Sequence, residues 1–260
     1  MITLAAVLLA VSCGQNKPQK ALVLYYSQNG TTKVVADAIA QALDADVEEV
    51  VAVNPYDGDF GATIERCKEE MAQGVLPEIQ PIKANLNAYD VVFIGYPIWF
   101  GTFAPPVETL LNNIDLSGKK VVPFCTFGSG GLDSSVKALQ EKQPDAEILP
   151  GYGVRTARAD AIPAEVDRFL KESGFIAGEY SKPAPFGEAH AVSEEESAIF
   201  DAAVGDYPMI HAKAAEVAAR NVEGGVEYFF TANNVDNPGT IKVYVLVEDG
   251  KAPVFTQVLR

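Results

Sequence analysis

The chain has 260 residues, 48% of them hydrophobic, so it is long enough to bury one large core or two smaller ones. It carries 20 basic and 35 acidic side chains, a formal charge of −15, which argues against a nucleic-acid-binding surface. Its three cysteines are too few for a disulfide framework, and no cluster of Cys and His has the spacing of a metal site.

The first segment, MITLAAVLLAVSCG, is uncharged and predicts the hydrophobic region of a signal peptide that is too short to span a bilayer. Its end, LLAVSCG, resembles a bacterial lipoprotein box in which Cys13 is lipidated. Two features depart from that pattern, because no Lys or Arg precedes the apolar run and Ala10 stands where Leu is usual. We expect residues 1–13 to be a lipoprotein signal that anchors the protein on the periplasmic side of the bacterial cell envelope. A secreted or periplasmic protein is the alternative.

Strand-like and helix-like segments alternate from residue 21 to residue 174. Continuous apolar or β-branched runs predict strands at 21–26, 47–53, 89–97, 119–127 and 147–154. Apolar residues at helical spacing predict helices at 31–43, 61–73, 105–114, 132–142 and 163–174. Five strands interleaved with helices predict an α/β fold with a parallel sheet and right-handed crossovers.

The pattern changes after residues 181–190, which contain Pro and Gly and are predicted to be a linker. Next, SEEESAIFDAAV (193–204) predicts a helix that begins with a capping box of Ser193 and Glu196. Alternating runs separated by turn sequences then predict antiparallel strands at 226–232, 240–247 and 253–259. Residues 191–260 are therefore expected to form a separate small α+β domain.

Three loops follow the carboxyl ends of predicted strands, which is where ligands bind in open α/β sheets. The first, SQNGTT, opens a helix and combines backbone N–H groups with side-chain donors, so it predicts a phosphate-binding nest. An ordinary capped turn is the alternative, because the same residue types favour turns. The sequence lacks the Gly-Lys-Ser/Thr end of a P-loop and the Gly-x-Gly-x-x-Gly of a dinucleotide site. The residues concerned are Ser27, Gln28, Asn29, Gly30, Thr31 and Thr32.

The other two loops suit a flat ligand. The second contains the chain's one Trp, Trp99, beside Phe100, and predicts a stacking face for a planar ring, with core packing as the alternative. The third, TFGSGG, has three glycines whose backbone amides can lie against the edge of that ring. Together the loops describe a site for a mononucleotide with a large planar base. The residues concerned are Pro97, Ile98, Trp99, Phe100, Gly101 and Thr102 in the second loop, and Thr126, Phe127, Gly128, Ser129, Gly130 and Gly131 in the third.

The segments LVLYYSQNGTTKVVADAIA, YDVVFIGYPIWFGTFAPPVETLL and LSGKKVVPFCTFGSGG strongly resemble the flavodoxin-like family, in the branch whose second loop reads Gly-Tyr-Pro-Ile-Trp. The resemblance covers about 21–175, within a domain that we place at 14–180. It implies a short-chain, three-layer sandwich with strand order 2-1-3-4-5. It also implies FMN as the cofactor, with the phosphate at 27–32. The isoalloxazine would then lie between 97–102 and 126–131, against Trp99 or Phe100.

Members of this family divide between electron carriers and reductases of quinones or similar small acceptors. The resemblance implies no acid–base catalytic residue, because the flavin itself carries out the redox chemistry. Reduced nicotinamide is not normally supplied in the periplasm. We therefore expect an FMN-dependent electron carrier or oxidoreductase whose partner is a redox protein or a small acceptor.

The C-terminal part resembles the cystatin-like fold more faintly. ARNVEGGVEYFFTANN resembles that family's first hairpin and the strand after it, and IKVYVLVEDGKAPVFTQV resembles the closing strands. The composition of IHAKAAEVAARN favours a helix, but the resemblance makes it a strand, and we predict a strand. A protein-binding or protease-inhibitor module is the alternative function. The charge of Glu223 in the hairpin and a second hairpin without Trp argue against inhibition and favour a structural or partner-docking role.

Overall fold

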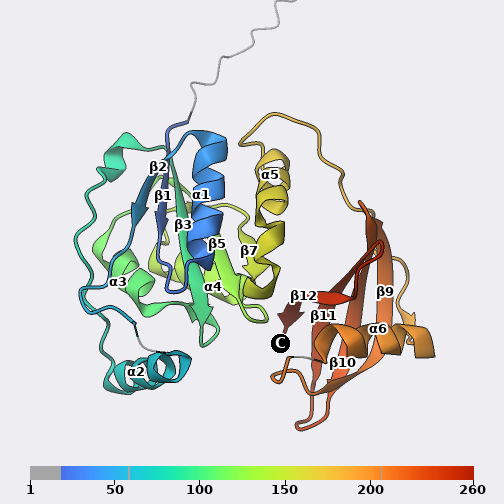
Figure 1. Cartoon of the computed structure of the whole chain (residues 1–260). Coiled ribbons are helices and arrows are strands. Elements are labelled where there is room, and N and C mark those ends of the chain that lie inside the picture. The colour runs from blue at the N-terminus through green and yellow to red at the C-terminus, as the bar shows by residue number, and fades with distance from the viewer. Residues whose placement is uncertain (1–18, 58, 206) are drawn as a thin grey trace, which may run out of the picture.

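A computed structural model describes residues 19–57, 59–205 and 207–260. Figure 1 shows two units side by side, one built on a parallel sheet and one on an antiparallel sheet. The predicted lipidation site, Cys13, lies outside the described residues.

The first unit has the strand order β2-β1-β3-β5, and both β6 and β7 pair with the far side of β5. Its strands are β1 (Ala21–Tyr25), β2 (Asp46–Glu49), β3 (Val91–Trp99), β4 (Thr102–Phe103), β5 (Lys120–Phe127), β6 (Glu147–Ile148) and β7 (Tyr152–Arg155). Its helices are α1 (Thr31–Leu43), α2 (Phe60–Gln73), α3 (Pro105–Asn113), α4 (Leu132–Lys142) and α5 (Ile162–Glu172), with 3-10 turns η1 (Leu86–Ala88) and η2 (Thr156–Ala161). The predicted flavodoxin-like order 2-1-3-4-5 is confirmed, with β6 and β7 as two pieces of the fifth strand.

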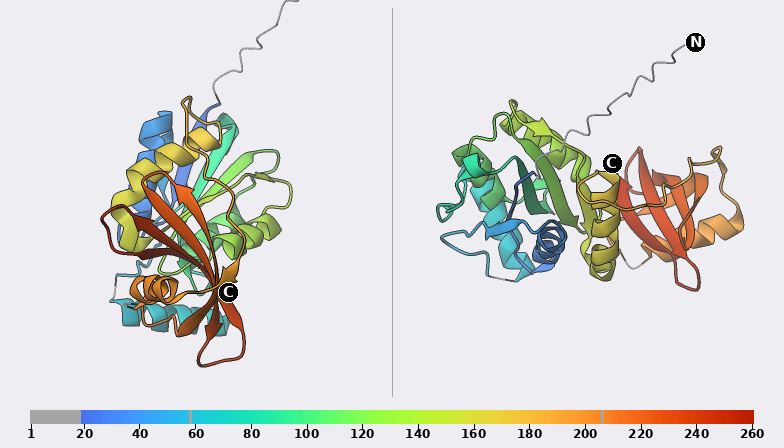
Figure 2. Two further views of the ribbon diagram at one scale, coloured as in Figure 1. Left: turned by 90° about the vertical axis from the view of Figure 1, so that its right-hand side faces the viewer. Right: turned by 90° about the horizontal axis from the view of Figure 1, so that it is seen from above.

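Both faces of this sheet are buried. Residues of α1 and α5 pack on one face with Val23 and Phe93, whereas α3 and α4 cover the other face with Leu24 and Ile94 (Figures 1 and 2). Because alternate residues of each strand enter different cores, the strands read as unbroken apolar runs in the sequence.

The two edge strands are shorter than predicted. The run at 47–53 ends as a strand at Glu49, and beyond it Ala52 makes an isolated bridge to Ile79. The run at 147–154 is interrupted between β6 and β7, where Pro150 has no N–H to donate to a ladder.

The second unit is a five-stranded antiparallel sheet in the order β12-β11-β10-β9-β8, and α6 packs on one face of it. Its elements are β8 (His190–Ala191), α6 (Glu194–Val204), β9 (Ala212–Val222), β10 (Gly225–Asn234), β11 (Thr240–Glu248) and β12 (Val254–Leu259). The capping box of Ser193 and Glu196 is present, so that prediction is confirmed. The predicted strand within 210–221 is also confirmed, because β9 pairs with β10 along its length despite its Ala-rich composition.

Within the described residues 173–189, which join the two units, the chain forms no helix or strand. Nor does any helix in the described part of the chain have the length and apolar character needed to cross a membrane.

Candidate functional site

The three loops lie beyond the carboxyl ends of the parallel strands, at the lower end of the sheet in Figure 1. One hydrogen bond joins two of these loops directly, and a second joins the remaining loop to a neighbouring helix. The hydroxyls of Thr32 and Thr126 are 2.8 Å apart in the buried interior, which connects the first loop to the third. Ser134, in the helix that follows the third loop, donates from its Oγ to the carbonyl of Gly101 at 2.6 Å. The topology therefore brings all three loops into one site.

The first loop ends in a helix N-terminus that carries no neutralising carboxylate. Gly30 is the N-cap of α1 with φ +88°, and a Cβ at this position would meet no atom within 4 Å. The backbone N–H groups of Gly30 and Lys33 reach Ser27 Oγ at 3.1 and 3.3 Å, which are long contacts to a neutral acceptor. The first turn has no acidic side chain, and Lys33 Nζ is paired with Asp37. This open, positively polarised turn fits a phosphate dianion.

Gln28 and Asn29 have different surroundings within the same loop. Gln28 Nε2 donates to Thr63 Oγ1 at 2.7 Å and to the Tyr56 carbonyl at 3.3 Å, so this side chain ties the loop to α2 and the segment before it. Asn29 is exposed, and its Oδ1 accepts the Thr31 N–H at 3.4 Å. Both residues are exposed, but Gln28 is held by its contacts with Tyr56 and Thr63, so Asn29 is the side chain of the pair that is freer to turn towards a ligand.

In the second loop the two adjacent aromatic residues lie in different environments. Trp99 is the last residue of β3, and its ring makes edge contacts with Tyr26 and Tyr56 at centroid distances of 5.9 and 5.1 Å. Phe100 is 52% exposed and has φ +50°, and Gly101 follows with φ +83°, so β3 turns into β4 through a two-residue hairpin. A left-handed conformation costs a bulky residue about 1–2 kcal/mol, and such strain is common at ligand sites. Of the two rings, Phe100 has the accessible face.

Trp99 packs on an ordered support. The Tyr56 hydroxyl donates to Glu70, and the Arg66 guanidinium lies 3.7 Å from the centre of the Tyr56 ring. Arg66 in turn pairs with Glu70 at 2.8 Å. Burial, together with the carboxylate of Glu70, raises the pKa of Tyr56, so its hydroxyl stays protonated at neutral pH.

The third loop begins inside the core and ends against the second unit. Thr126 and Phe127 are buried in β5, whereas Gly128 is exposed. Arg155 Nε donates to the Gly128 carbonyl at 2.8 Å, and the Val258 N–H donates to the Ser129 carbonyl at 2.6 Å.

Sequence reasoning missed both Arg155 and Val258. Arg155 ends β7 at the same edge of the sheet, so the rule that selected the three loops applies to it as well. No sequence signal pointed to Val258, which belongs to the other unit.

The two cysteines in the described part of the chain, Cys67 and Cys125, are buried free thiols. Burial raises the pKa of both, to about 11 for Cys67, so neither is a reactive thiolate at neutral pH. The described residues contain no group of three His, Cys, Asp or Glu side chains that could hold a metal ion.

Comparison with known proteins agrees with the fold of the first unit. A family profile described as flavodoxin matches residues 20–167. A protein assigned as a flavoprotein from Bacteroides eggerthii is 34% identical over 57% of this chain and 96% of its own, with a TM-score of 0.50. Another from Bacteroides uniformis is 28% identical over 58% of this chain and 99% of its own, with a TM-score of 0.51. A flavoprotein from Lactobacillus acidophilus in complex with FMN is 29% identical over 59% of this chain and 99% of its own, with a TM-score of 0.48. No curated protein sequence matched the chain.

The family match spans more than half of the chain and ends before the antiparallel unit begins. With the parallel sheet, its strand order and the three loops at its carboxyl edge, this match shows that the chain belongs to the flavodoxin family.

Proposed function

We propose that this protein binds FMN at the three loops and uses it to transfer electrons. The observation that carries the proposal is the α1 N-terminus, which lacks a carboxylate and is joined to the glycine-rich loop by the Thr32–Thr126 hydrogen bond. The donors at this turn are amides and hydroxyls, which suit a phosphate ester and offer no proton chemistry of their own.

The residues have distinct roles in this proposal. The N–H groups of the first turn of α1, with Ser27 and Thr31, would hold the phosphate. Phe100 would lie against the isoalloxazine, and the backbone of 128–131 would bond its polar edge. When bound, FMN supplies one- and two-electron transfer, and the protein sets its potential through the hydrogen bonds and charges around the ring.

For the biological setting we propose an electron carrier, or a reductase of a small acceptor such as a quinone, at the bacterial cell envelope. The motif LLAVSCG supports an anchor at Cys13. The absence of a carboxylate, His or Cys from residues 27–32 fits a protein whose cofactor does the chemistry. Purified protein with FMN, NADPH and a quinone tests the choice, because rapid turnover favours the reductase and no turnover favours the carrier.

The site itself is tested by comparing FMN with riboflavin, which has the same ring system but no phosphate. We expect wild-type protein to bind FMN at least tenfold more tightly than riboflavin, measured by quenching of Trp99 fluorescence. Asn29→Asp keeps the acceptor for the Thr31 N–H but adds a charge beside the phosphate. It should weaken FMN binding about tenfold, given like-charge repulsion of about 1–4 kcal/mol, and should leave riboflavin binding unchanged.

Asn87→Asp is the matched control, because it makes the same charge change at an exposed position before β3, at the opposite edge of the sheet. Equal loss of FMN affinity in both variants would mean that net charge alone is responsible. Colourless protein that takes up no FMN would contradict the proposed function.

The cystatin-like identity of the second unit is also a proposal, supported by its order of one strand, a helix and a four-stranded meander. We propose that this unit acts in structure or docking rather than in protease inhibition, because the turn between β9 and β10 carries Glu223. Inhibition of papain by the purified protein would contradict this assignment.

A further inference from the structure

The second unit holds the third loop through its strand β12. The Val258 N–H donates to the Ser129 carbonyl at 2.6 Å, and Val258 is only 3% exposed. A Cβ on Gly130 would lie 2.3 Å from the Val258 carbonyl oxygen, so the two backbones approach as closely as glycine allows. At the end of β12, Arg260 Nη1 donates to Ser129 Oγ at 3.2 Å.

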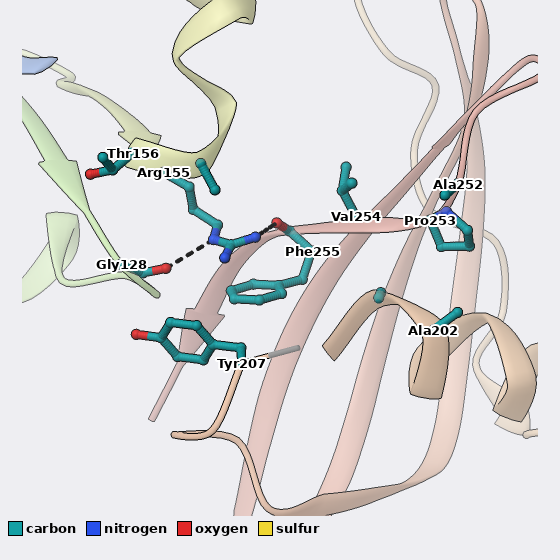
Figure 3. Close-up of a pocket in the computed structure, with 11 residues that line it drawn as sticks. Gly128, Arg155, Thr156, Ala202, Tyr207, Ala252, Pro253, Val254 and Phe255 are labelled. Carbon is teal, nitrogen blue, oxygen red and sulfur yellow. Dashed lines mark hydrogen bonds between the residues drawn. The ribbon is translucent and has the colours of Figure 1, made fainter. Parts of the chain in front are cut away.

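Arg155 binds both units at once. Its Nε donates to the Gly128 carbonyl at 2.8 Å, and its Nη1 donates to the Phe255 carbonyl at 2.9 Å (Figure 3). The guanidinium lies 3.3 Å from the centre of the Phe255 ring and 5.5 Å from that of Tyr207. All of these contacts are made by the planar guanidinium of Arg155, so this one group fixes the position of the loop relative to β12.

The Arg155 guanidinium has no carboxylate of the described residues within ion-pair distance. Burial lowers the pKa of Arg155 to about 10, so the side chain keeps its charge at neutral pH. A half-buried cation that bonds only carbonyl groups contributes geometric specificity more than Coulomb energy.

Tyr207 completes the contact. A Cβ on Gly128 would lie 2.7 Å from the Tyr207 hydroxyl oxygen, so this side chain lies against the first glycine of the loop. Residues 128, 129 and 130 are thus each in contact with the second unit, and the carbonyls of Gly128 and Ser129 are already bonded before any ligand binds.

We propose that the second unit is a built-in clamp that pre-organises the third loop for FMN, and that Arg155 is its positioning residue. This inference rests on the proposed function. Fixing the backbone of a residue costs conformational entropy, and a loop with three glycines has more freedom to lose than most. When the second unit orders the loop in the free protein, the ligand does not have to, and the apparent dissociation constant falls in inverse proportion to the fraction of molecules whose loop is ordered.

The test uses full-length Arg155→Gln and Arg155→Lys, with two readouts. One readout is the FMN dissociation constant, and the other is hydrogen exchange of the Val258 amide without FMN. Arg155→Lys keeps the charge but cannot bond the Gly128 and Phe255 carbonyls with one planar group, so it separates clamping from electrostatics. Arg220→Gln is the control, because Arg220 also stacks on an aromatic ring, that of Phe186, and pairs with Glu227 away from the loop.

We expect both Arg155 variants to bind FMN about tenfold more weakly and to exchange the Val258 amide at least tenfold faster, whereas Arg220→Gln matches wild type. By linkage, FMN should slow Val258 exchange in the wild-type protein. If Arg155→Gln does not fold, Arg155→Lys carries the test.

Three results would overturn the clamp. The first is an FMN affinity within twofold of wild type in the folded Arg155 variants. The second is a wild-type affinity in Arg155→Lys. The third is a Val258 amide that exchanges in the wild-type protein as fast as an amide in an unstructured chain. A wild-type chain that binds no FMN overturns the proposed function and the clamp together, whereas normal FMN binding in every variant overturns the clamp alone.

Discussion

The hydrogen bond between Thr32 and Thr126 gives a quantitative test of how the first and third loops are held together. Both residues are buried, 1% and 2% exposed, and their hydroxyls are 2.8 Å apart. Replacing either one by Val keeps the shape but leaves the other hydroxyl without this partner. An unpaired buried hydroxyl costs about 1–3 kcal/mol, so each single variant should lose that much free energy of unfolding.

The double variant, Thr32→Val with Thr126→Val, should be less destabilised than either single variant, because no polar group is then left unpaired. Urea unfolding of the FMN-free protein measures all three free energies, and the coupling between the two sites should be about 1–3 kcal/mol. The exposed Thr240→Val serves as the control and should change stability by less than about 0.5 kcal/mol. Losses that simply add in the double variant would refute the reasoning, because they would show that the two hydroxyls do not depend on each other.

Three further predictions concern the second loop and the buried thiol. Phe100→Gly should weaken FMN binding about tenfold, which a fluorescence titration measures. Urea unfolding should show a change in the free energy of unfolding of less than about 1 kcal/mol, because relief of positive-φ strain offsets the flexibility of Gly. Tyr56→Ala should remove about 3 kcal/mol of stability and shift the emission of Trp99, the chain's single Trp, to longer wavelength; an unchanged spectrum would mean that Tyr56 does not shield the indole. Cys67 should resist iodoacetamide in the native protein at pH 8 and react only in urea, because burial raises its pKa to about 11. Since the unfolded thiol has a pKa of about 8.5, its contribution to stability is complete below that pH and is lost as pH rises through 11, so Cys67→Ala should reduce the alkaline loss of stability.

Much of the first unit was predictable because its strands are buried on both faces. A run such as ALVLYY has no polar residue to give a period of two, so it indicates a covered strand, and the helices between such runs follow from their own periodicity. The strand order could not come from periodicity and rested on the family resemblance. In the second unit, β9 shows the limit of composition, because its Ala-rich sequence favours a helix until β8 and β10 provide ladder partners.

The positions of the three loops were predictable, but the directions of their side chains were not. Trp99 and Phe100 are adjacent and both aromatic, and only the hairpin between β3 and β4 decides that Trp99 packs inward and Phe100 points outward. The contacts of Arg155 with Phe255 and of Ser129 with Arg260 join residues 100 and 131 positions apart. No local pattern in one sequence encodes a contact at that separation.

That separation also has a consequence for biosynthesis. A ribosome adds about 5–20 residues per second, so β12 emerges roughly 6–26 s after Ser129 has left the tunnel. The last strand of the flavodoxin sheet and α5 emerge early in this interval, and for the rest of it the glycine loop has no contact with β12. Flavin uptake should accordingly be a late event, completed only once β12 is available to fold onto the loop, and truncated chains that end before residue 258 should retain little flavin.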